Sequence, residues 1–178
     1  MNLISRHCSA LLAVVLLSSA IFAQERPQID SDYDRDKNKT TVKMAPVKIS
    51  GDKDKYHSLY MSPSFSYSGQ QRTRPETIDF ELQTVVKGKL DVDLYVVFIV
   101  DGETIFLSSN RWGIKRPVPG RRWMGERLVF RMPYDMLVKM TAARSVAVKL
   151  DAVKFEFGEE PMQAIRDFTK YMQSIGGE

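Results

Sequence analysis

The segment Ser58-Leu59-Tyr60-Met61-Ser62-Pro63-Ser64-Phe65-Ser66-Tyr67-Ser68 alternates between two kinds of side chain almost without interruption. One set is apolar and consists of Leu59, Met61, Pro63, Phe65 and Tyr67. The other set consists of serines and Tyr60. A period of two places the two sets on opposite faces of a β-strand. We therefore expect a strand over residues 58–68 with one buried face and one wet, serine-rich face.

Similar patterns on both sides of this segment predict further strands. They cover residues 42–49, 78–82, 103–107, 127–132, 146–150 and 153–157. The first of these changes phase at Ala45-Pro46, which indicates a bulge or an edge position. The run 94–100 is apolar at every position and predicts a central strand covered on both faces. Asp101-Gly102 follows it and is typical of a hairpin turn.

Two segments have helical spacing instead. Pro133-Tyr134-Asp135 opens a short internal helix that reaches about residue 144. Residues 159–175 predict an amphipathic C-terminal helix. The fold class is therefore mainly β, at the margin of α+β. We expect an antiparallel β-sandwich or open barrel of about eight strands, with one of the helices, most simply the C-terminal one, covering the second face of the strand at 94–100.

The N-terminus has the layout of a secretory signal peptide. A short basic start is followed by an apolar run from Ala10 to Ala23, which is 14 residues long. A membrane-spanning helix needs about 20 residues, so we expect residues 1–23 to be cleaved rather than kept as an anchor. Residues 24–39 are polar and are expected to form a flexible lead. Residues 40–178 then form a single β-rich domain.

Composition and charge narrow the classes of protein to which the chain can belong. The only cysteine, Cys8, lies in the signal peptide, so the exported protein has no disulfide. Exported proteins without cysteine are more typical of bacteria than of animals, which favours a periplasmic or extracellular bacterial protein. Cleavage also removes Arg6 and lowers the formal charge from +4 to +3. A balance this small indicates neither nucleic-acid nor membrane binding.

The sequence offers little for catalysis or for cofactors. His57 is the only histidine after residue 23, in a polar stretch that we expect to be a loop, and no serine lies in a Gly-x-Ser-x-Gly motif. Asp30-x-Asp32-x-Asp34-x-Asp36 resembles the start of a calcium loop but lacks its glycine and its final glutamate. We therefore predict no metal, no cofactor and no catalytic residue. The carboxylate pairs Asp79/Glu81 and Asp91/Asp93 leave open a hydrolase acting on envelope polysaccharide.

The segment 110–124 is the most unusual part of the chain. It contains five basic residues, both tryptophans and no acid, so the rest of the exported chain sums to −2. Arginine and tryptophan are enriched at binding hot spots, and a loop this long in a compact domain is often functional. The predicted partner-binding residues are Arg111, Trp112, Lys115, Arg116, Arg121, Arg122 and Trp123. In the alternative, both tryptophans cap an open end of the fold and the arginines are merely solvated.

Three classes of function remain after these exclusions. The first is an exported, non-enzymatic module that binds an anionic polymer or an envelope protein through segment 110–124. The second is the carboxylate-based hydrolase, and the third is a structural component of the envelope. The sequence favours the first class over an enzyme, because its strongest signal is a concentration of charge and aromatic surface rather than a set of catalytic groups.

Overall fold

The structure is a computed structural model of the chain. It describes residues 27–49, 56–71, 73–87, 95–110, 116–117, 123–150 and 153–175. The expected signal peptide and its cleavage site lie outside the described residues. The described residues form eleven strands and two helices. Every strand pairing among them is antiparallel, which confirms the predicted mainly β fold.

The strands form two sheets that join at one point. Sheet A has the order β1-β2-β4-β5-β9, with β3 on the edge of β4 and β8 on the edge of β9. Its strands are β1 (Ile29–Asp34), β2 (Lys39–Met44), β3 (Val47–Ile49), β4 (Tyr56–Ser68), β5 (Thr77–Lys87), β8 (Arg116–Pro117) and β9 (Trp123–Pro133). Sheet B has the order β7-β6-β10-β11. Its strands are β6 (Tyr95–Val100), β7 (Glu103–Asn110), β10 (Val146–Leu150) and β11 (Val153–Glu156). The end of β7 pairs with β9 and links the sheets.

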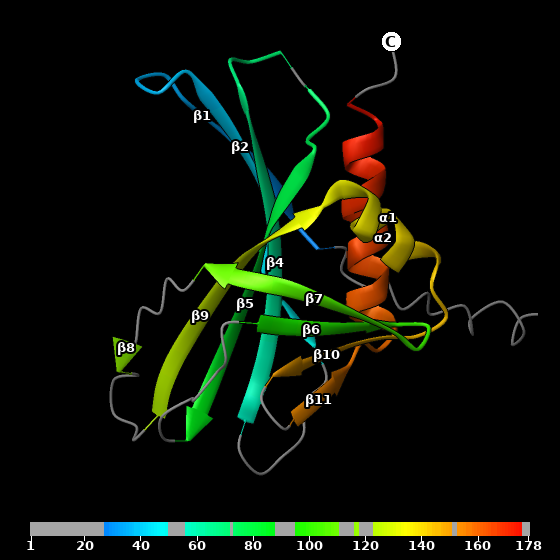
Figure 1. Cartoon of the computed structure of the whole chain (residues 1–178). Helices are drawn as coiled ribbons and strands as arrows, with labels where there is room; N and C mark the ends of the chain where they lie inside the picture. The colour runs from blue at the N-terminus through cyan, green and yellow to red at the C-terminus, as the bar shows by residue number, and fades with distance from the viewer. Residues whose placement is uncertain are drawn as a thin grey trace, which may run out of the picture.

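Sheet B and the two helices cover the same side of sheet A. Sheet B crosses the lower part of the long strands β4, β5 and β9, and α1 (Tyr134–Ala142) and α2 (Glu159–Gln173) lie beside the upper part (Figure 1). Phe168 of α2 contacts Phe65 of β4 edge-on, with ring centroids 5.8 Å apart. Each helix buries the apolar side that its spacing predicts, because that side faces the core. Both helices also begin and end close to the positions expected from the sequence.

Three phenylalanine rings join the sheets at the centre of the core. Phe80 of β5 and Phe130 of β9 stack at 5.5 Å, and Phe98 of β6 lies against both at 5.8 and 5.5 Å. All three side chains are fully buried or nearly so. Phe168 belongs to the same cluster of buried residues. Phe98 of the all-apolar segment 94–100 and Phe168 of the C-terminal helix therefore belong to one buried core.

β6 is fully covered on one face and only partly covered on the other. Val96, Phe98 and Val100 are buried, whereas Val97 and Ile99 on the opposite face are only partly buried. The helices do not cover this second face, because they pack on the core side beside sheet A (Figure 1). An apolar side chain at every position of a strand is therefore compatible with a second face that is only partly buried.

Residues 29–39, which belong to the segment expected to be a polar lead, form a strand and a turn in the structure. Residues 29–34 form β1, which pairs along its whole length with β2, so that Asp30, Asp32 and Asp34 lie opposite Lys43, Thr41 and Lys39. The polar composition suits an edge strand, because charges on an edge hinder pairing with other chains. Asn38 adopts a left-handed φ of 46° in the turn that follows. The backbone of His57, expected in a loop, likewise lies in a strand, β4.

Candidate functional site

The structure describes the backbone of two of the seven predicted binding residues. Arg116 lies in β8 opposite Gly125, and Trp123 is the first residue of β9, opposite Lys87 of β5. The predicted residues Arg111, Trp112, Lys115, Arg121 and Arg122 lie outside the described residues. Two of the predicted positions are therefore attached to the same end of β9.

Segment 110–124 is not the single long loop that its composition suggests. Asn110 at the end of β7 pairs with Val129, and Arg116 of β8 pairs with Gly125, so both strands lie along one edge of β9. Trp123 and Met124 belong to β9 itself. The sequence does not predict this pairing, because a two-residue strand is too short to show a period of two. The glycine and proline residues of the segment also favour the interpretation as a loop.

The outer face of sheet A, the face turned away from sheet B, carries most of the described charged residues of its strands. One row crosses all five main strands in register and contains Asp30, Lys43, Ser64, Asp79 and Arg131. Acidic, basic and hydroxyl side chains alternate along this row. Cross-strand neighbours of opposite charge stabilise a sheet, so the face compensates much of its own charge.

Glu81 lies at the centre of this outer face and is nevertheless only 3% exposed. Its carboxylate accepts hydrogen bonds from Arg127 and Gln83, and Lys43 Nζ lies 3.5 Å from Oε2. Lys43 comes from β2 and reaches Glu81 on β5 across β4, where only small serine side chains intervene. The serine column that the sequence predicts therefore has a structural consequence: it leaves room for the lysine to bury a carboxylate.

These contacts limit what the carboxylates can do chemically. Asp79 and Glu81 project from one face, as their spacing predicts, but Glu81 is held by three donors and Asp79 lies 3.9 Å from Arg131. The second carboxylate pair, Asp91/Asp93, lies outside the described residues. Within the part of the chain that the structure describes, no group of three or more histidine, cysteine or acidic side chains could hold a metal ion.

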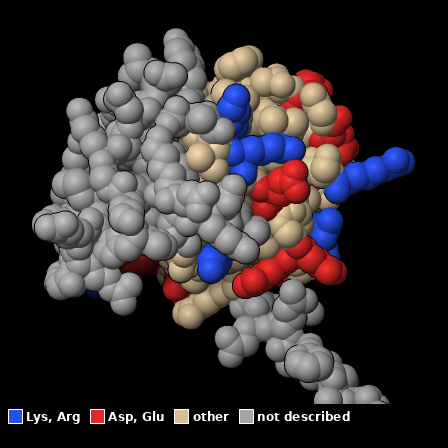
Figure 2. All heavy atoms as spheres, turned by 90° about the horizontal axis from the view of Figure 1, so that it is seen from below, with Lys and Arg blue, Asp and Glu red and all other residues tan. Residues whose placement is uncertain are grey.

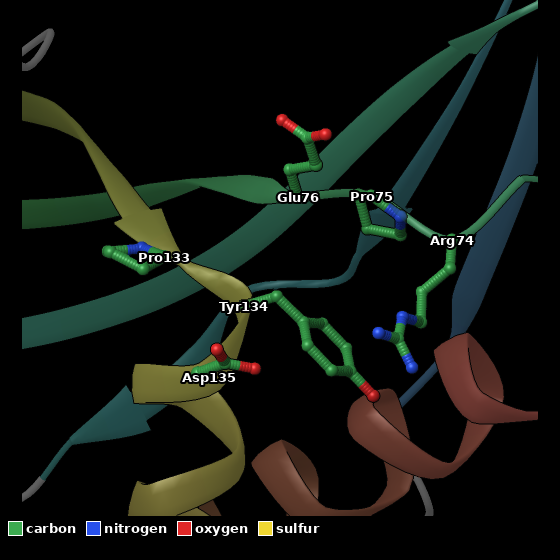
Figure 3. Close-up of a pocket in the computed structure, with 6 residues that line it drawn as sticks. All are labelled: Arg74, Pro75, Glu76, Pro133, Tyr134 and Asp135. Carbon is green, nitrogen blue, oxygen red and sulfur yellow. The ribbon is translucent and has the colours of Figure 1, made fainter.

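A shallow hollow lies where the chain enters β5 and leaves β9. It measures about 300 Å³ and is lined by Arg74, Pro75, Glu76, Pro133, Tyr134 and Asp135. The guanidinium of Arg74 lies 4.9 Å from the centre of the Tyr134 ring. Figure 3 shows Arg74 and Asp135 on different sides of this ring, with Glu76 pointing away from it. Sequence reasoning missed this hollow, although Arg74-Pro75-Glu76 and Pro133-Tyr134-Asp135 both carry proline beside charge.

The outer face of sheet B has a different chemistry. Phe106 of β7 is 67% exposed, and its cross-strand neighbour Val97 is partly buried. Ile99, also partly buried, extends the apolar surface into the next row, where its cross-strand neighbour Ala147 is buried, and Lys149 adjoins Val97. The result is an apolar stripe with a basic neighbour on the opposite side from Phe106.

Comparisons with known proteins add no relative to this description. No protein-family model matches the chain, and neither a curated protein sequence nor a solved structure matches it significantly. Neither helix in the described residues is long and apolar enough to cross a membrane. The fold and the charge distribution therefore carry the functional argument.

Proposed function

We propose that the protein is exported after cleavage behind Ala23 and acts as a non-enzymatic binding module. Its contact region is the basic segment 110–124, and its partner is an anionic polymer or the acidic surface of an envelope protein. The observation that carries the proposal is the concentration of five positive charges and two tryptophans in a chain that otherwise sums to −2 after cleavage. Such a concentration attracts anions over roughly one Debye length, about 8 Å at physiological salt.

The described surface supports this choice of contact region. Acidic and basic side chains lie next to one another on the described part of the face seen in Figure 2, without a wide area of one sign. Among the described residues, Lys139 and Glu103 form an ion pair, as do Lys154 and Glu156, so part of the described charge is compensated locally. An anionic partner is therefore attracted less strongly to this mixed-charge surface than to segment 110–124.

The attachment of the segment is a second support. Arg116 and Trp123 are fixed at the backbone by pairing with Gly125 and Lys87, and β9 pairs with β5 over its full length. A binding residue whose backbone is already ordered loses less conformational entropy when its partner arrives. The ion pairs of Asp79 and Glu81 also favour binding over carboxylate-based hydrolysis, because a general acid or base must be free to exchange protons with its substrate.

The direct test reverses the charge of the segment. Arg121→Glu/Arg122→Glu is compared with Arg144→Glu/Lys149→Glu, whose original side chains are exposed and have no ion-pair partner among the described residues. Fluorescein-labelled poly-L-glutamate and polyphosphate serve as probes in anisotropy titrations at low and physiological ionic strength. The first variant should lose at least about ten-fold in affinity and most of its salt dependence. The control variant should bind both polymers nearly as the wild type does.

Either of two results would contradict the proposal. One is that neither polymer binds the wild-type protein, and the other is that both double variants bind equally well. Trp112→Ala then separates a binding anchor from a capping residue. A binding anchor loses affinity at constant stability, whereas a capping tryptophan loses about 3–5 kcal/mol of unfolding free energy.

Export is tested separately by the intact mass of the protein recovered outside the cytoplasm. The mass should correspond to a chain that begins at Gln24. A mature protein that retains Met1 would disprove cleavage after Ala23, whatever the protein binds.

A further inference from the structure

The hollow between the start of β5 and the start of α1 contains a guanidinium whose N–H groups have no hydrogen-bond acceptor among the described residues. Arg74 is exposed and has neither an ion pair nor a hydrogen bond among the described residues. Its one described interaction is with the face of the Tyr134 ring, 4.9 Å from the centroid. A contact with a ring face leaves N–H donors at the edge of the guanidinium available, and such donors match a carboxylate in a two-point geometry.

Tyr134 supplies a second free group beside Arg74. Only 7% of the residue is exposed, but its hydroxyl oxygen reaches solvent and has no hydrogen-bond partner among the described residues. A tyrosine hydroxyl that reaches solvent without a protein partner can donate to or accept from a ligand. Figure 3 shows the ring extending from α1 so that its hydroxyl ends on the side of Arg74. The guanidinium and the hydroxyl can therefore donate to the same anionic group.

The acidic residues of the hollow are free as well. The carboxylates of Glu76 and Asp135 form no ion pair with Arg74 and have no other partner among the described residues. Asp135 lies on a different side of the Tyr134 ring from Arg74, whereas Glu76 points away from the ring (Figure 3). The hollow thus presents a positive end and a negative end to one bound molecule.

We propose that this hollow binds a small zwitterion, namely a free amino acid or a short peptide. Its carboxylate is held by Arg74 and the Tyr134 hydroxyl, and its ammonium group faces Asp135. The volume of about 300 Å³ is at the lower end of small-molecule sites and fits a ligand of this size. The site lies apart from segment 110–124 in the sequence and does not depend on the function proposed for that segment.

The walls of the hollow are already fixed in the free protein. The amide of Tyr134 donates to the carbonyl of Glu76 at 2.9 Å, and Thr77 pairs with Pro133 at the adjoining ends of β5 and β9. Pro75 and Pro133 restrict the backbone further, because proline has a fixed φ. A preformed site avoids the ordering cost that a flexible loop pays when it binds.

The test uses L-alanyl-L-alanine and two analogues that each lack one charge. N-acetyl-L-alanyl-L-alanine has no ammonium group, and L-alanyl-L-alanine amide has no carboxylate. Amide chemical-shift titrations of the ¹⁵N-labelled protein should show saturable shifts around Tyr134 and Asp135 with the dipeptide. Both analogues should bind at least about ten-fold more weakly, since each loses one charged hydrogen-bonding partner.

Three variants assign the binding to the named side chains. Arg74→Gln and Asp135→Asn should each weaken dipeptide binding at least about ten-fold, and Tyr134→Phe should weaken it by a smaller factor. Arg35→Gln and Asp36→Asn change the same residue types in the exposed β1–β2 turn and should leave binding unchanged. Circular dichroism and thermal unfolding confirm that each variant is folded. The proposal fails if the dipeptide gives no saturable shifts, or if folded Arg74→Gln binds it as tightly as the wild type.

Discussion

The outer faces of the two sheets reverse the usual relation between polarity and exposure. On sheet A, Glu81 is 3% exposed although its strand alternates regularly and turns it away from the core. On sheet B, Phe106 is 67% exposed although its neighbours Val97 and Ile99 are apolar. Sheet A buries a charge under long basic side chains, whereas sheet B leaves an aromatic ring in contact with solvent.

The comparison shows that the alternation of polar and apolar residues along a strand predicts which way each side chain points, but not how exposed it is. The direction of each side chain follows from the two-residue period of a strand. Its exposure depends on what the neighbouring strands supply, such as Lys43 reaching over the serines of β4 towards Glu81. On sheet B, Val97 is the partner of Phe106 in the adjacent strand, and Lys149, two strands away in the same row, leaves the Phe106 ring 67% exposed.

The largest expected effect on the unfolding free energy comes from the core, where the inner faces of the two sheets pack together. Phe98→Ala removes a ring that contacts Phe80 and Phe130 across the core, and it should lower the unfolding free energy by about 3–5 kcal/mol. Val97→Ala, one residue earlier on the outer face, should cost about 1 kcal/mol or less, because that side chain is only partly buried. Urea denaturation measures both. Equal costs would mean that the outer face of sheet B is covered in solution.

Most of this architecture follows from local patterns that the sequence displays directly. The strand at 58–68, the hairpin turn at Asp101-Gly102 and both helices lie where their periodicity places them. β1 was not predicted, because its aspartates resemble a disordered lead until β2 provides a pairing partner. β8 was missed because its two residues form no pattern at all.

The next effect concerns the buried carboxylate of sheet A. Glu81→Gln keeps the shape but removes the charge that Arg127 and Lys43 neutralise. The basic side chains are 45% exposed and can be rehydrated, so the cost should be about 1–3 kcal/mol, below that of an ion pair buried on both sides. Asp79→Asn, in the next row of the same face, should cost less than about 0.5 kcal/mol because its pair with Arg131 is exposed. A cost for Glu81→Gln no larger than for Asp79→Asn would show that the cluster does not stabilise the sheet.

The candidate sites were less predictable than the fold, for physical reasons. The basic segment is visible in composition, since charge and tryptophan content need no tertiary information. The Glu81 cluster joins β2, β5 and β9, and the hollow joins Arg74 to Tyr134, so both depend on strand order. Strand order is set by packing across the whole chain and cannot be obtained from any one segment.

A smaller effect is expected on the exposed stripe of sheet B. Phe106→Thr replaces an exposed ring by a residue that suits a strand, so the unfolding free energy should change by less than about 0.5 kcal/mol. The same change should reduce self-association at high concentration, because it removes the largest exposed apolar side chain among the described residues. Denaturation and sedimentation velocity measure the two quantities. A large loss of stability would instead place Phe106 in a contact that the described residues do not show.

The smallest effect compares two exposed ion pairs, one at the edge of each sheet. In the β1–β2 turn, the hydrogen bond from Lys37 Nζ lowers the pKa of Asp34 and raises the pKa of Lys37, and the Lys37 backbone amide, 3.1 Å from Asp34 Oδ1, lowers the Asp34 pKa further. On β11, the Lys154 side chain, 2.9 Å away, lowers the pKa of Glu156, and no backbone donor contributes.

Lys37→Met should therefore raise the pKa of Asp34 only part of the way to an ordinary aspartate value, because the amide at position 37 still donates. Lys154→Met should return the pKa of Glu156 to its ordinary value. A carboxylate with a lowered pKa stabilises the fold above its unfolded pKa, and this contribution disappears as the pH falls through the folded pKa. Each variant should thus lose a small contribution to stability that is present only above the pKa of the carboxylate. Lys37→Met should keep more of the contribution of Asp34 than Lys154→Met keeps of the contribution of Glu156. NMR titration of the side-chain carboxyl carbons measures both values, and complete recovery at Asp34 would show that the turn amide does not donate in solution.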